Sequence, residues 1–372
     1  MLRRRPGHPR CDGSQRPTPC MAWANPEHRR LNASPQSISI LGAGAIGCFL
    51  GAHWAPALRA AGAKITLIGR KETWNRMGTG SLSLTGGETL DTQLSLLDLA
   101  DSPEALSTSD VIVLTMKSTG LDQAIEEIRD HAPEGTPIIT LLNGVSATRH
   151  LRHSLPNHRI IPGMVPFNVV WRSNRHLHRS SPGQVTVERC AITESLARTL
   201  AATGAPIAVQ DDLLPHQYGK LLLNLINPIN ALSGLPLHAM LCDRGYRRIY
   251  SAALREALVV YAAAGVRWRR VGPISPHLVH RLLLLPNALF NTTLLKIQKL
   301  DRNSMTSMAV DLAAGRATEI DTITGEILKL AQSSGCSAPV NAALYDMIKA
   351  AEAGPGPAQG FSAETLLRDL RL

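Results

Sequence analysis

The sequence predicts an α/β domain with a mostly parallel sheet, followed by an all-helical domain. In the first half, strand-like runs alternate with helical segments, and a glycine-rich turn directly follows the first of these runs. After about residue 212 the pattern changes to long helical periodicities. The 372 residues, 44% of them hydrophobic, are enough for two domains with separate cores.

The glycine-rich turn is the strongest local motif. The β-type run Ile38 to Leu41 leads into Gly42-x-Gly44-x-x-Gly47 and then into an apolar helical segment. This strand, turn and helix order is what a Rossmann-type dinucleotide site requires, with free N–H groups at the helix start facing the phosphates. A Rossmann domain is therefore predicted over residues 37–211. Its turn is expected to bind the cofactor through Gly42, Ala43, Gly44, Ala45, Ile46 and Gly47.

The second strand, "KITLIG", ends at Arg70, where an NAD site usually has an Asp or Glu for the ribose hydroxyls. An arginine there suits the 2′-phosphate of NADP, by charge and by its fork of donors. The alternative is an arginine that only solvates a strand end. We expect NADPH as the cofactor.

Two further core strands, "DVIVLTMK" and "PIITLLNG", end near Lys117 and Asn143. Ligands of parallel sheets bind at the carboxyl ends of the strands, so both residues are candidate cofactor-binding groups. The segment from Ile160 to Val187 is expected to extend the sheet with antiparallel strands. His176 and His178 are expected in a solvated hairpin or loop.

The helical domain is predicted over residues 212–353, with a tail over 354–372. Within "YGKLLLNLINPINAL", Lys220, Asn224 and Asn227 share one helix face at 100° per residue. A narrow polar face flanked by leucines indicates either a polar pocket or a solvated surface. Pro228 is expected to kink or end the helix.

Acidic residues later in the chain have simpler local interpretations. Thr318 and Asp321 fit a capping box, which makes Glu319 a first-turn acid favoured by the helix dipole. Asp311 is expected to be a solvated or capping acid. Ser307 carries only a weak signal of its own.

Charge, cysteines and hydropathy limit the class of protein. Residues 1–36 hold seven arginines and two acids, which predicts a basic, disordered and dispensable extension, with Met21 as a later start. The whole chain has a net charge of +10 and residues 1–36 contribute +5, so the rest has a net charge of about +5. This charge does not indicate a nucleic-acid-binding protein. The six cysteines are scattered and form no CxxC pair, so we expect no structural zinc site. The sequence has no run of 18 apolar residues, so we expect no membrane span and a soluble cytoplasmic protein.

Together these residues resemble the ketopantoate reductase (2-dehydropantoate 2-reductase) family. The resemblance rests on "ILGAGAIG", Arg70, "LTMKS", "LLNG", "KLLLN" and "TSMAVDLAAGRATEID", and runs from about Ser37 to Met347. It implies a Rossmann domain that binds NADPH and a helical domain like the C-terminal domain of 6-phosphogluconate dehydrogenase. The implied reaction reduces 2-dehydropantoate to pantoate for pantothenate and coenzyme A synthesis.

The resemblance also assigns roles to single residues. It makes Lys220 the general acid and Glu319 its acidic partner, with Lys117 and Asn143 between cofactor and substrate. It also implies substrate contacts from Asn224 and Ser307. The family's second asparagine comes one residue later, where this chain has Pro228, so Asn227 and Asn230 are alternative substrate-binding residues.

Two rival functions remain open from the sequence alone. A related Rossmann dehydrogenase could act on another 2-oxo acid, a sugar acid or an opine, with His216 as the available catalytic histidine. A non-catalytic NADP-binding regulatory protein should lack the polar helix that begins near Lys220. The expected partner is a small-molecule 2-oxo acid, with the oligomeric state open and a homodimer among the possibilities.

Overall fold

The computed structural model describes residues 35–272, 274–292, 302–354 and 360–372. The expectations for residues 1–34, including disorder and a later start at Met21, fall outside this part of the chain. The described residues belong to one compact unit.

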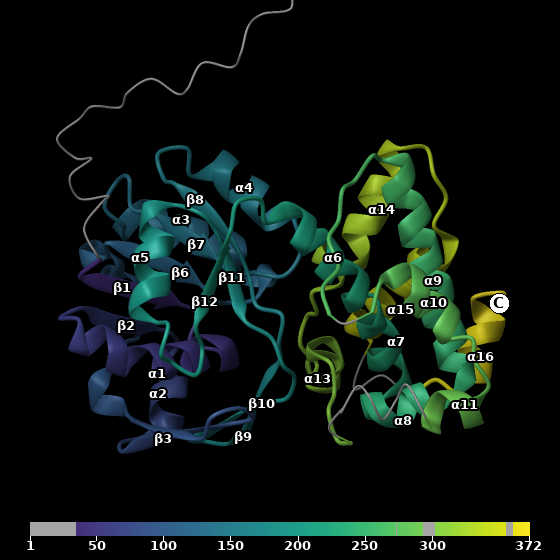
Figure 1. Cartoon of the computed structure of the whole chain (residues 1–372), viewed down its shortest axis with the longest axis horizontal. Coiled ribbons are helices and arrows are strands. Elements are labelled where there is room, and N and C mark those ends of the chain that lie inside the picture. Colours follow the sequence, from purple (N-terminus) through teal and green to yellow (C-terminus); the bar gives the residue numbers. More distant parts are fainter. Residues whose placement is uncertain (1–34, 273, 293–301, 355–359) are drawn as a thin grey trace, which may run out of the picture. The chain divides into compact units, whose positions relative to one another are not determined.

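An eight-stranded sheet forms the centre of the first domain (Figure 1). Its strand order is β12-β11-β8-β7-β6-β1-β2-β5. Every neighbouring pair is parallel except β11 with β8. The mostly parallel sheet predicted from the sequence is therefore confirmed. Its strands are β1 (Ser37–Leu41), β2 (Lys64–Ile68), β5 (Asp98–Ala100), β6 (Val111–Leu114), β7 (Ile138–Thr140), β8 (Ile160–Met164), β11 (Val185–Glu188) and β12 (Ile207–Gln210).

Helices bury apolar stripes against this sheet. In α3 (Leu121–His131), the buried residues fall at positions i, i+3, i+4 and i+7, the spacing of one helix face. That face joins α4 (Ser146–Ser154) in one core cluster with β1, β6, β7 and β8. The helix α1 (Ala45–Ala60) packs on β2 and also contacts a second, smaller sheet. Shorter elements around them are α2 (Lys71–Met77), η2 (Leu94–Leu96), η3 (Pro103–Thr108), η4 (Ser118–Gly120) and α5 (Ala191–Thr199).

The smaller sheet corrects one expectation. Its order is β4-β3-β10-β9, from β3 (Ser81–Thr85), β4 (Leu90–Gln93), β9 (Val169–Ser173) and β10 (His176–Arg179). Antiparallel extension of the main sheet is thus correct only for β11. His176 and His178 lie in β10, which forms an antiparallel hairpin with β9, so the expected hairpin is present. Both residues are half-buried rather than solvated, and Thr85 on the neighbouring strand β3 bonds to their rings at 2.8 and 2.9 Å.

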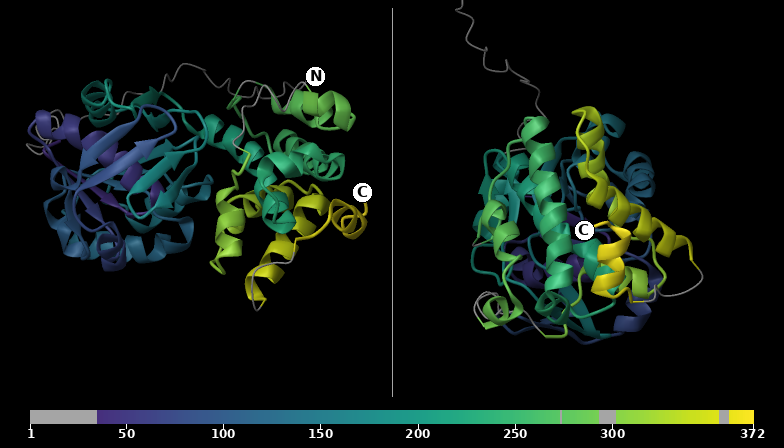
Figure 2. Two further views of the ribbon diagram at one scale, coloured as in Figure 1. Left: turned by 90° about the horizontal axis from the view of Figure 1, so that it is seen from below. Right: turned by 90° about the vertical axis from the view of Figure 1, so that its right-hand side faces the viewer.

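The second domain is helical, as predicted, and is built around α9 (Arg244–Ala263). This helix begins after Asp243, whose side chain accepts from Gly245 N at 2.7 Å and so caps it. Figure 2 shows α9 alongside the other helices of this domain. They are α6 (Leu214–Asn224), α7 (Ile226–Ser233), α8 (Leu237–Cys242), α10 (Pro276–Leu282), α11 (Asn287–Thr292), α13 (Ser307–Ala313), α14 (Thr324–Ser333), α15 (Pro339–Ala353) and α16 (Ala363–Asp369), with η5 (Ile320–Thr322).

The helix that carries Lys220 and Asn224 ends just before Pro228, as expected from the sequence. The segment divides at Leu225 into α6 and α7. Pro228 has no N–H to donate to the carbonyl of Asn224, so a continuous α-helical ladder cannot pass this point. The break puts Lys220 and Asn224 on one short helix and Asn227 on the next.

The C-terminal residues are not a tail. Ala363, Leu366 and Leu370 are buried in the core of the helical domain, and α16 packs on α9. The helical domain therefore continues beyond residue 353. Among the described residues, no helix is long and apolar enough to cross a membrane, and no group of His, Cys, Asp and Glu side chains could hold a metal ion.

Candidate active site

The glycine turn has the space that a dinucleotide needs. Gly42 has φ +111°, and a Cβ on it would lie 2.3 Å from the backbone N of Met116. A Cβ on Gly47 would lie 2.2 Å from the carbonyl oxygen of Gly42, so both positions require glycine. At Gly44, by contrast, a Cβ would meet nothing within 4 Å. This open space faces the start of α1, whose first turn has no acidic residue, and the arrangement fits a pyrophosphate.

Arg70 lies close to this turn. It is exposed, follows β2 and directly precedes α2. The preceding residue, Gly69, contacts the turn, because a Cβ there would lie 2.3 Å from the Cβ of Ala43. Arg70 therefore follows the second strand as expected, and its contact with a cofactor stays a prediction.

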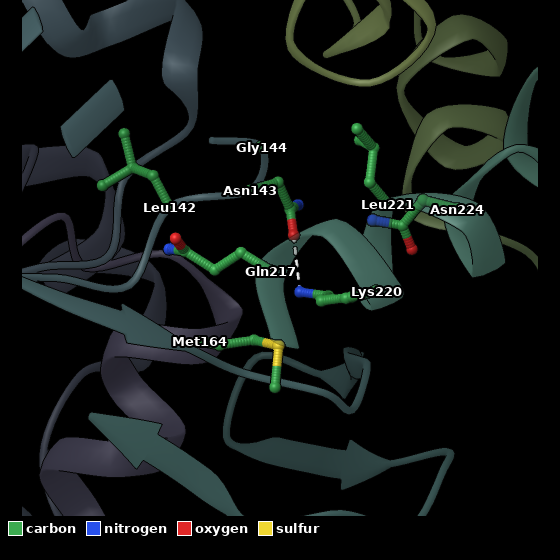
Figure 3. Close-up of a pocket in the computed structure, with 8 residues that line it drawn as sticks. All are labelled: Leu142, Asn143, Gly144, Met164, Gln217, Lys220, Leu221 and Asn224. Carbon is green, nitrogen blue, oxygen red and sulfur yellow. Dashed lines mark hydrogen bonds between the residues drawn. The ribbon is translucent and has the colours of Figure 1, made fainter. Parts of the chain in front are cut away.

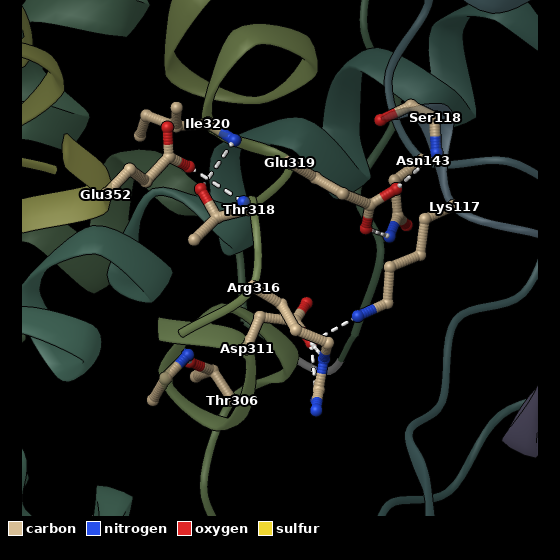
Figure 4. A network of polar contacts seen from close by, with 11 residues as sticks. Lys117, Ser118, Asn143, Thr306, Asp311, Arg316, Thr318, Glu319, Ile320 and Glu352 are labelled. Carbon is tan, nitrogen blue, oxygen red and sulfur yellow. Dashed lines mark hydrogen bonds and ion pairs between the residues drawn. The ribbon is translucent and has the colours of Figure 1, made fainter. Parts of the chain in front are cut away.

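Three polar side chains that are distant in sequence form one chain of hydrogen bonds. Lys220 Nζ donates to Asn143 Oδ1 at 2.7 Å (Figure 3). Asn143 Nδ2 donates to Glu319 Oε2 at 2.7 Å (Figure 4). Lys220 also donates to the carbonyl oxygen of Val165 at 2.6 Å, and Glu319 Oε1 accepts from Ser118 N at 3.2 Å. An ammonium group and a carboxylate are thus connected through one amide.

Two opposing influences act on the pKa of Lys220. Burial lowers the pKa of Lys220 from 10.5 to about 8, while the carboxylate of Glu319 acts in the opposite direction. Burial is the larger of these two influences. A lysine with a pKa near 8 holds a proton at neutral pH and can also release it.

A small cavity adjoins this ammonium group. Its volume is about 10 Å³, which is room for about one water molecule. The surface that its lining exposes is mostly polar, so a ligand there would meet mainly hydrogen-bonding groups. The cavity is lined by Leu142, Asn143, Gly144, Met164, Gln217, Lys220, Leu221 and Asn224 (Figure 3).

Comparison with known proteins identifies the family. The model described as Ketopantoate reductase PanE/ApbA matches residues 38–191, and its C-terminal counterpart matches residues 212–352. The chain belongs to the ketopantoate reductase family. Proteins of this family are oxidoreductases that use a nicotinamide cofactor on a small-molecule substrate.

Individual members of the family match over most of their length. The 2-dehydropantoate 2-reductase of Mesorhizobium japonicum is 27% identical over 328 residues, covering 79% of this chain and 90% of that protein. The crystal structure of a family ketopantoate reductase from Ralstonia eutropha has a TM-score of 0.71 at 24% identity, covering 85% of this chain and 98% of that one. A ternary structure of D-mandelate dehydrogenase with NADH and anilino(oxo)acetate has a TM-score of 0.66 at 20% identity, with coverage of 85% and 98%. These two structures show the shared fold.

Lys117 and Asp311 give a further correction. Lys117 Nζ forms an ion pair with Asp311 Oδ1, and Arg316 donates to the same oxygen through Nε at 3.2 Å and Nη2 at 2.9 Å. The side chain of Asp311 is only 3% exposed. Asp311 is therefore neither a solvated acid nor a helix cap, since Thr306 caps α13 by accepting from Ala309 N.

The capping box proposed around Glu319 is also absent. Thr318 N donates to Glu352 Oε1 at 2.7 Å, and Asp321 accepts from Tyr345 at 2.5 Å and from Lys349 at 3.2 Å. Side chains of α15 thus take Thr318 N and the Asp321 carboxylate, while Thr318 Oγ1 accepts locally from Ile320 N at 3.2 Å. They hold the η5 turn that carries Glu319 toward Asn143.

The remaining predicted substrate residues lie in different environments. Asn224 lines the cavity, Asn227 is buried in α7, and Ser307 is exposed at the start of α13. Asn230 is fully buried, donates to the carbonyl of Leu235 and accepts from Thr306 N. Asn230 is thus enclosed by protein, and it does not line the cavity beside Lys220.

Sequence reasoning missed several groups of the site. The carbonyl of Val165 holds Lys220, and a backbone group carries no side-chain signal. Ser118 and Gln217 lie in helical or turn segments without a motif of their own. Arg316 could not be predicted from the sequence, because its role as the second basic residue bound to Asp311 is visible only in the structure.

Proposed function

We propose that this chain catalyses the NADPH-dependent reduction of 2-dehydropantoate to pantoate, a step toward pantothenate and coenzyme A, with Lys220 as the general acid. The observation that carries the proposal is the hydrogen-bonded series Lys220, Asn143 and Glu319 beside a small cavity. Family membership supports the reaction class, and the pKa near 8 supports the role of the lysine.

The chemistry needs a hydride and a proton. The glycine turn would hold a nicotinamide cofactor, which when bound would supply the hydride for the ketone carbon. Negative charge then develops on the carbonyl oxygen of the substrate, and Lys220 donates a proton from Nζ to that oxygen, which yields the alcohol. Asn143 orients the ammonium group, and Glu319 favours its charged form before the transfer.

NADPH is proposed as the cofactor because of Arg70. Its guanidinium group is exposed next to the glycine turn, where a 2′-phosphate on the adenosine ribose would reach it. The fold alone leaves this choice open, because a protein of the same fold binds NADH.

Substrate orientation is assigned to the helical domain. The amide of Asn224 faces the cavity, and Ser307 is the exposed hydroxyl at the start of α13. Asn227 has no assigned contact. A cavity of about 10 Å³ is smaller than a 2-oxo acid, so substrate entry requires the lining groups to move apart.

A different 2-oxo acid is the second candidate substrate, because a structural neighbour binds anilino(oxo)acetate. The deciding experiment is a panel of 2-oxo acids with NADPH and with NADH, followed by nicotinamide absorbance. The proposal requires 2-dehydropantoate with NADPH to have the highest kcat/KM. A higher kcat/KM for an aromatic 2-oxo acid would refute the proposed substrate, and a higher kcat/KM with NADH would refute the proposed cofactor.

A further inference from the structure

Two cations share one buried carboxylate in this protein. Asp311 Oδ1 accepts from Arg316 and pairs with Lys117, while the carboxylate itself is 3% exposed (Figure 4). The side chains of Lys117 and Arg316 are 43% and 53% exposed. The negative charge thus lies behind the two positive charges, and a solvent-borne ligand meets the cations first.

The charges in this cluster do not balance. Lys117 and Arg316 contribute +2 and Asp311 contributes −1, which leaves +1 on its open side. A contact that served only to join two elements would be satisfied by one cation for one carboxylate. The unmatched charge favours an anion.

Arg316 is fixed in place by its backbone as well as its side chain. Its N–H donates to the carbonyl of Asp311 at 2.9 Å, directly after Gly315, whose φ of +62° turns the chain back over the end of α13. Nε and Nη2 are used on Asp311. Within the described part of the chain, Nη1 has no protein partner and is available to a ligand.

The segment that carries Lys117 borders the glycine turn. Lys117 directly follows Met116, whose backbone N would lie 2.3 Å from a Cβ on Gly42. Thr115 also donates to the carbonyl of Gly42 at 2.7 Å. The segment 115–117 therefore runs against the turn at which Gly44 leaves space for a pyrophosphate.

We propose that Arg316, a residue of the helical domain, binds the pyrophosphate of the dinucleotide together with Lys117, and that Asp311 is the positioning residue for both cations. The inference rests on the proposed function only in assuming that a dinucleotide occupies the glycine turn. Planar guanidinium groups suit phosphate oxygens, and such charge-assisted hydrogen bonds are short and strong.

The test measures NADPH binding rather than turnover. Dissociation constants of the full chain are measured by nicotinamide fluorescence for wild type, Arg316→Gln and Arg316→Lys, with NADH measured by displacement. Arg316→Gln should weaken NADPH and NADH by the same factor, roughly 10-fold for one lost charged contact. Arg316→Lys should recover part of this loss. The matched control is Arg255→Gln, which removes an exposed charge on α9.

Three outcomes would overturn the proposal. Unchanged NADPH affinity with a lower melting temperature would make the cluster a structural ion pair only. Loss of NADPH affinity without loss of NADH affinity would place Arg316 at the 2′-phosphate. A raised KM for the 2-oxo acid with normal cofactor binding would make it a carboxylate ligand. A wild-type chain that binds NADPH but does not reduce 2-dehydropantoate would refute the proposed function and leave this inference standing.

Discussion

Lys220 and Glu319 are connected through the two ends of a single amide, that of Asn143. Its oxygen accepts from the ammonium group and its nitrogen donates to the carboxylate, each at 2.7 Å. Asn143 follows a strand of the Rossmann domain, while its two partners come from the helical domain. The amide therefore connects an ammonium group to a carboxylate without placing the two charges in direct contact.

Substitution of Lys220, the proposed proton donor, should mainly affect the chemical step. Lys220→Ala should lower kcat by roughly 10²–10⁴-fold, the usual contribution of a positioned general acid. NADPH affinity should change little, because the glycine turn and Arg70 lie on other elements. Steady-state kinetics together with a separate NADPH titration check both statements.

The control for this variant is Asn224→Ala. It removes an amide from the same cavity but no transferable proton, so the pH dependence of kcat should persist. Near-normal kcat in Lys220→Ala, or failure caused only by lost NADPH binding, would return this lysine to a structural role.

Charge reversal at the end of β2 should act on cofactor choice. Arg70→Glu should raise the KM for NADPH far more than that for NADH, because only NADPH carries the 2′-phosphate. Lys64→Glu, the same charge reversal at the opposite end of β2, is the matched control and should change neither. Equal losses for both cofactors would show that Arg70 does not recognise the phosphate.

Truncation of the N-terminal segment should leave activity in place. The described hydrogen bonds begin with Gln36, whose N donates to Asp110 and whose carbonyl accepts from Lys64 N. A chain lacking residues 1–34 should therefore keep its stability and turnover. A chain lacking residues 1–36 should also turn over but melt at a lower temperature. Loss of 2-dehydropantoate reduction in a folded truncated chain would contradict this prediction.

The buried histidine of α1 should make stability depend on pH. The ring of His53 packs against Phe49 at 4.5 Å between centroids, and its Nδ1 has no hydrogen-bond partner among the described residues. Burial, assisted by Arg179, lowers the pKa of His53 from 6.5 to about 4. The unfolded chain binds this proton first, so the stabilisation present above pH 6.5 is lost as the pH falls toward 4, by on the order of 3 kcal/mol.

Urea unfolding of wild type and His53→Leu checks this effect. Other groups titrate in both proteins, so the informative quantity is the difference between their unfolding free energies at pH 7.5 and at pH 4.5. The unfolding free energy should therefore fall less in His53→Leu than in wild type between pH 7.5 and pH 4.5. Parallel stability curves would exclude His53 as the responsible group.

Local sequence patterns were sufficient to predict the fold, but not to predict every pair of side chains that interact within it. The glycine turn, the core strands and the helix break near Pro228 each depend on neighbours within a few residues, and the structure contains all of them. The burial of Asp311 and the partial burial of His176 were missed because the groups that bind them, Lys117 and Thr85, lie 194 and 91 residues away. No local pattern contains such pairs.

The site was predictable to a different degree. Periodicity placed Lys220 and Asn224 on one face, and both line the cavity. The connection to Glu319 came from family resemblance, because its local sequence favoured a capping acid. The sign of the pKa shift of Lys220 could not come from sequence, since it depends on how far burial outweighs one carboxylate.

The last prediction concerns that carboxylate. Lys220 must be protonated to donate, so kcat for reduction should be constant below its pKa of about 8 and fall as the pH rises above it. Glu319 raises this pKa, so Glu319→Gln should move the falling limb to lower pH. The variant should also lower kcat at pH 7, because a single amide oxygen cannot replace both carboxylate oxygens toward Asn143 and Ser118.

The matched control is Asp321→Asn, which removes the same charge two residues further on. Asp321 interacts with Tyr345 and Lys349 rather than with the ammonium group. Its pH profile for kcat should therefore overlay that of wild type, even if its melting temperature falls. If Glu319→Gln leaves the limb in place, or if both variants move it equally, Glu319 does not set the protonation of Lys220. The carboxylate would then serve only to position Asn143, and the pKa of the lysine would be governed by burial alone.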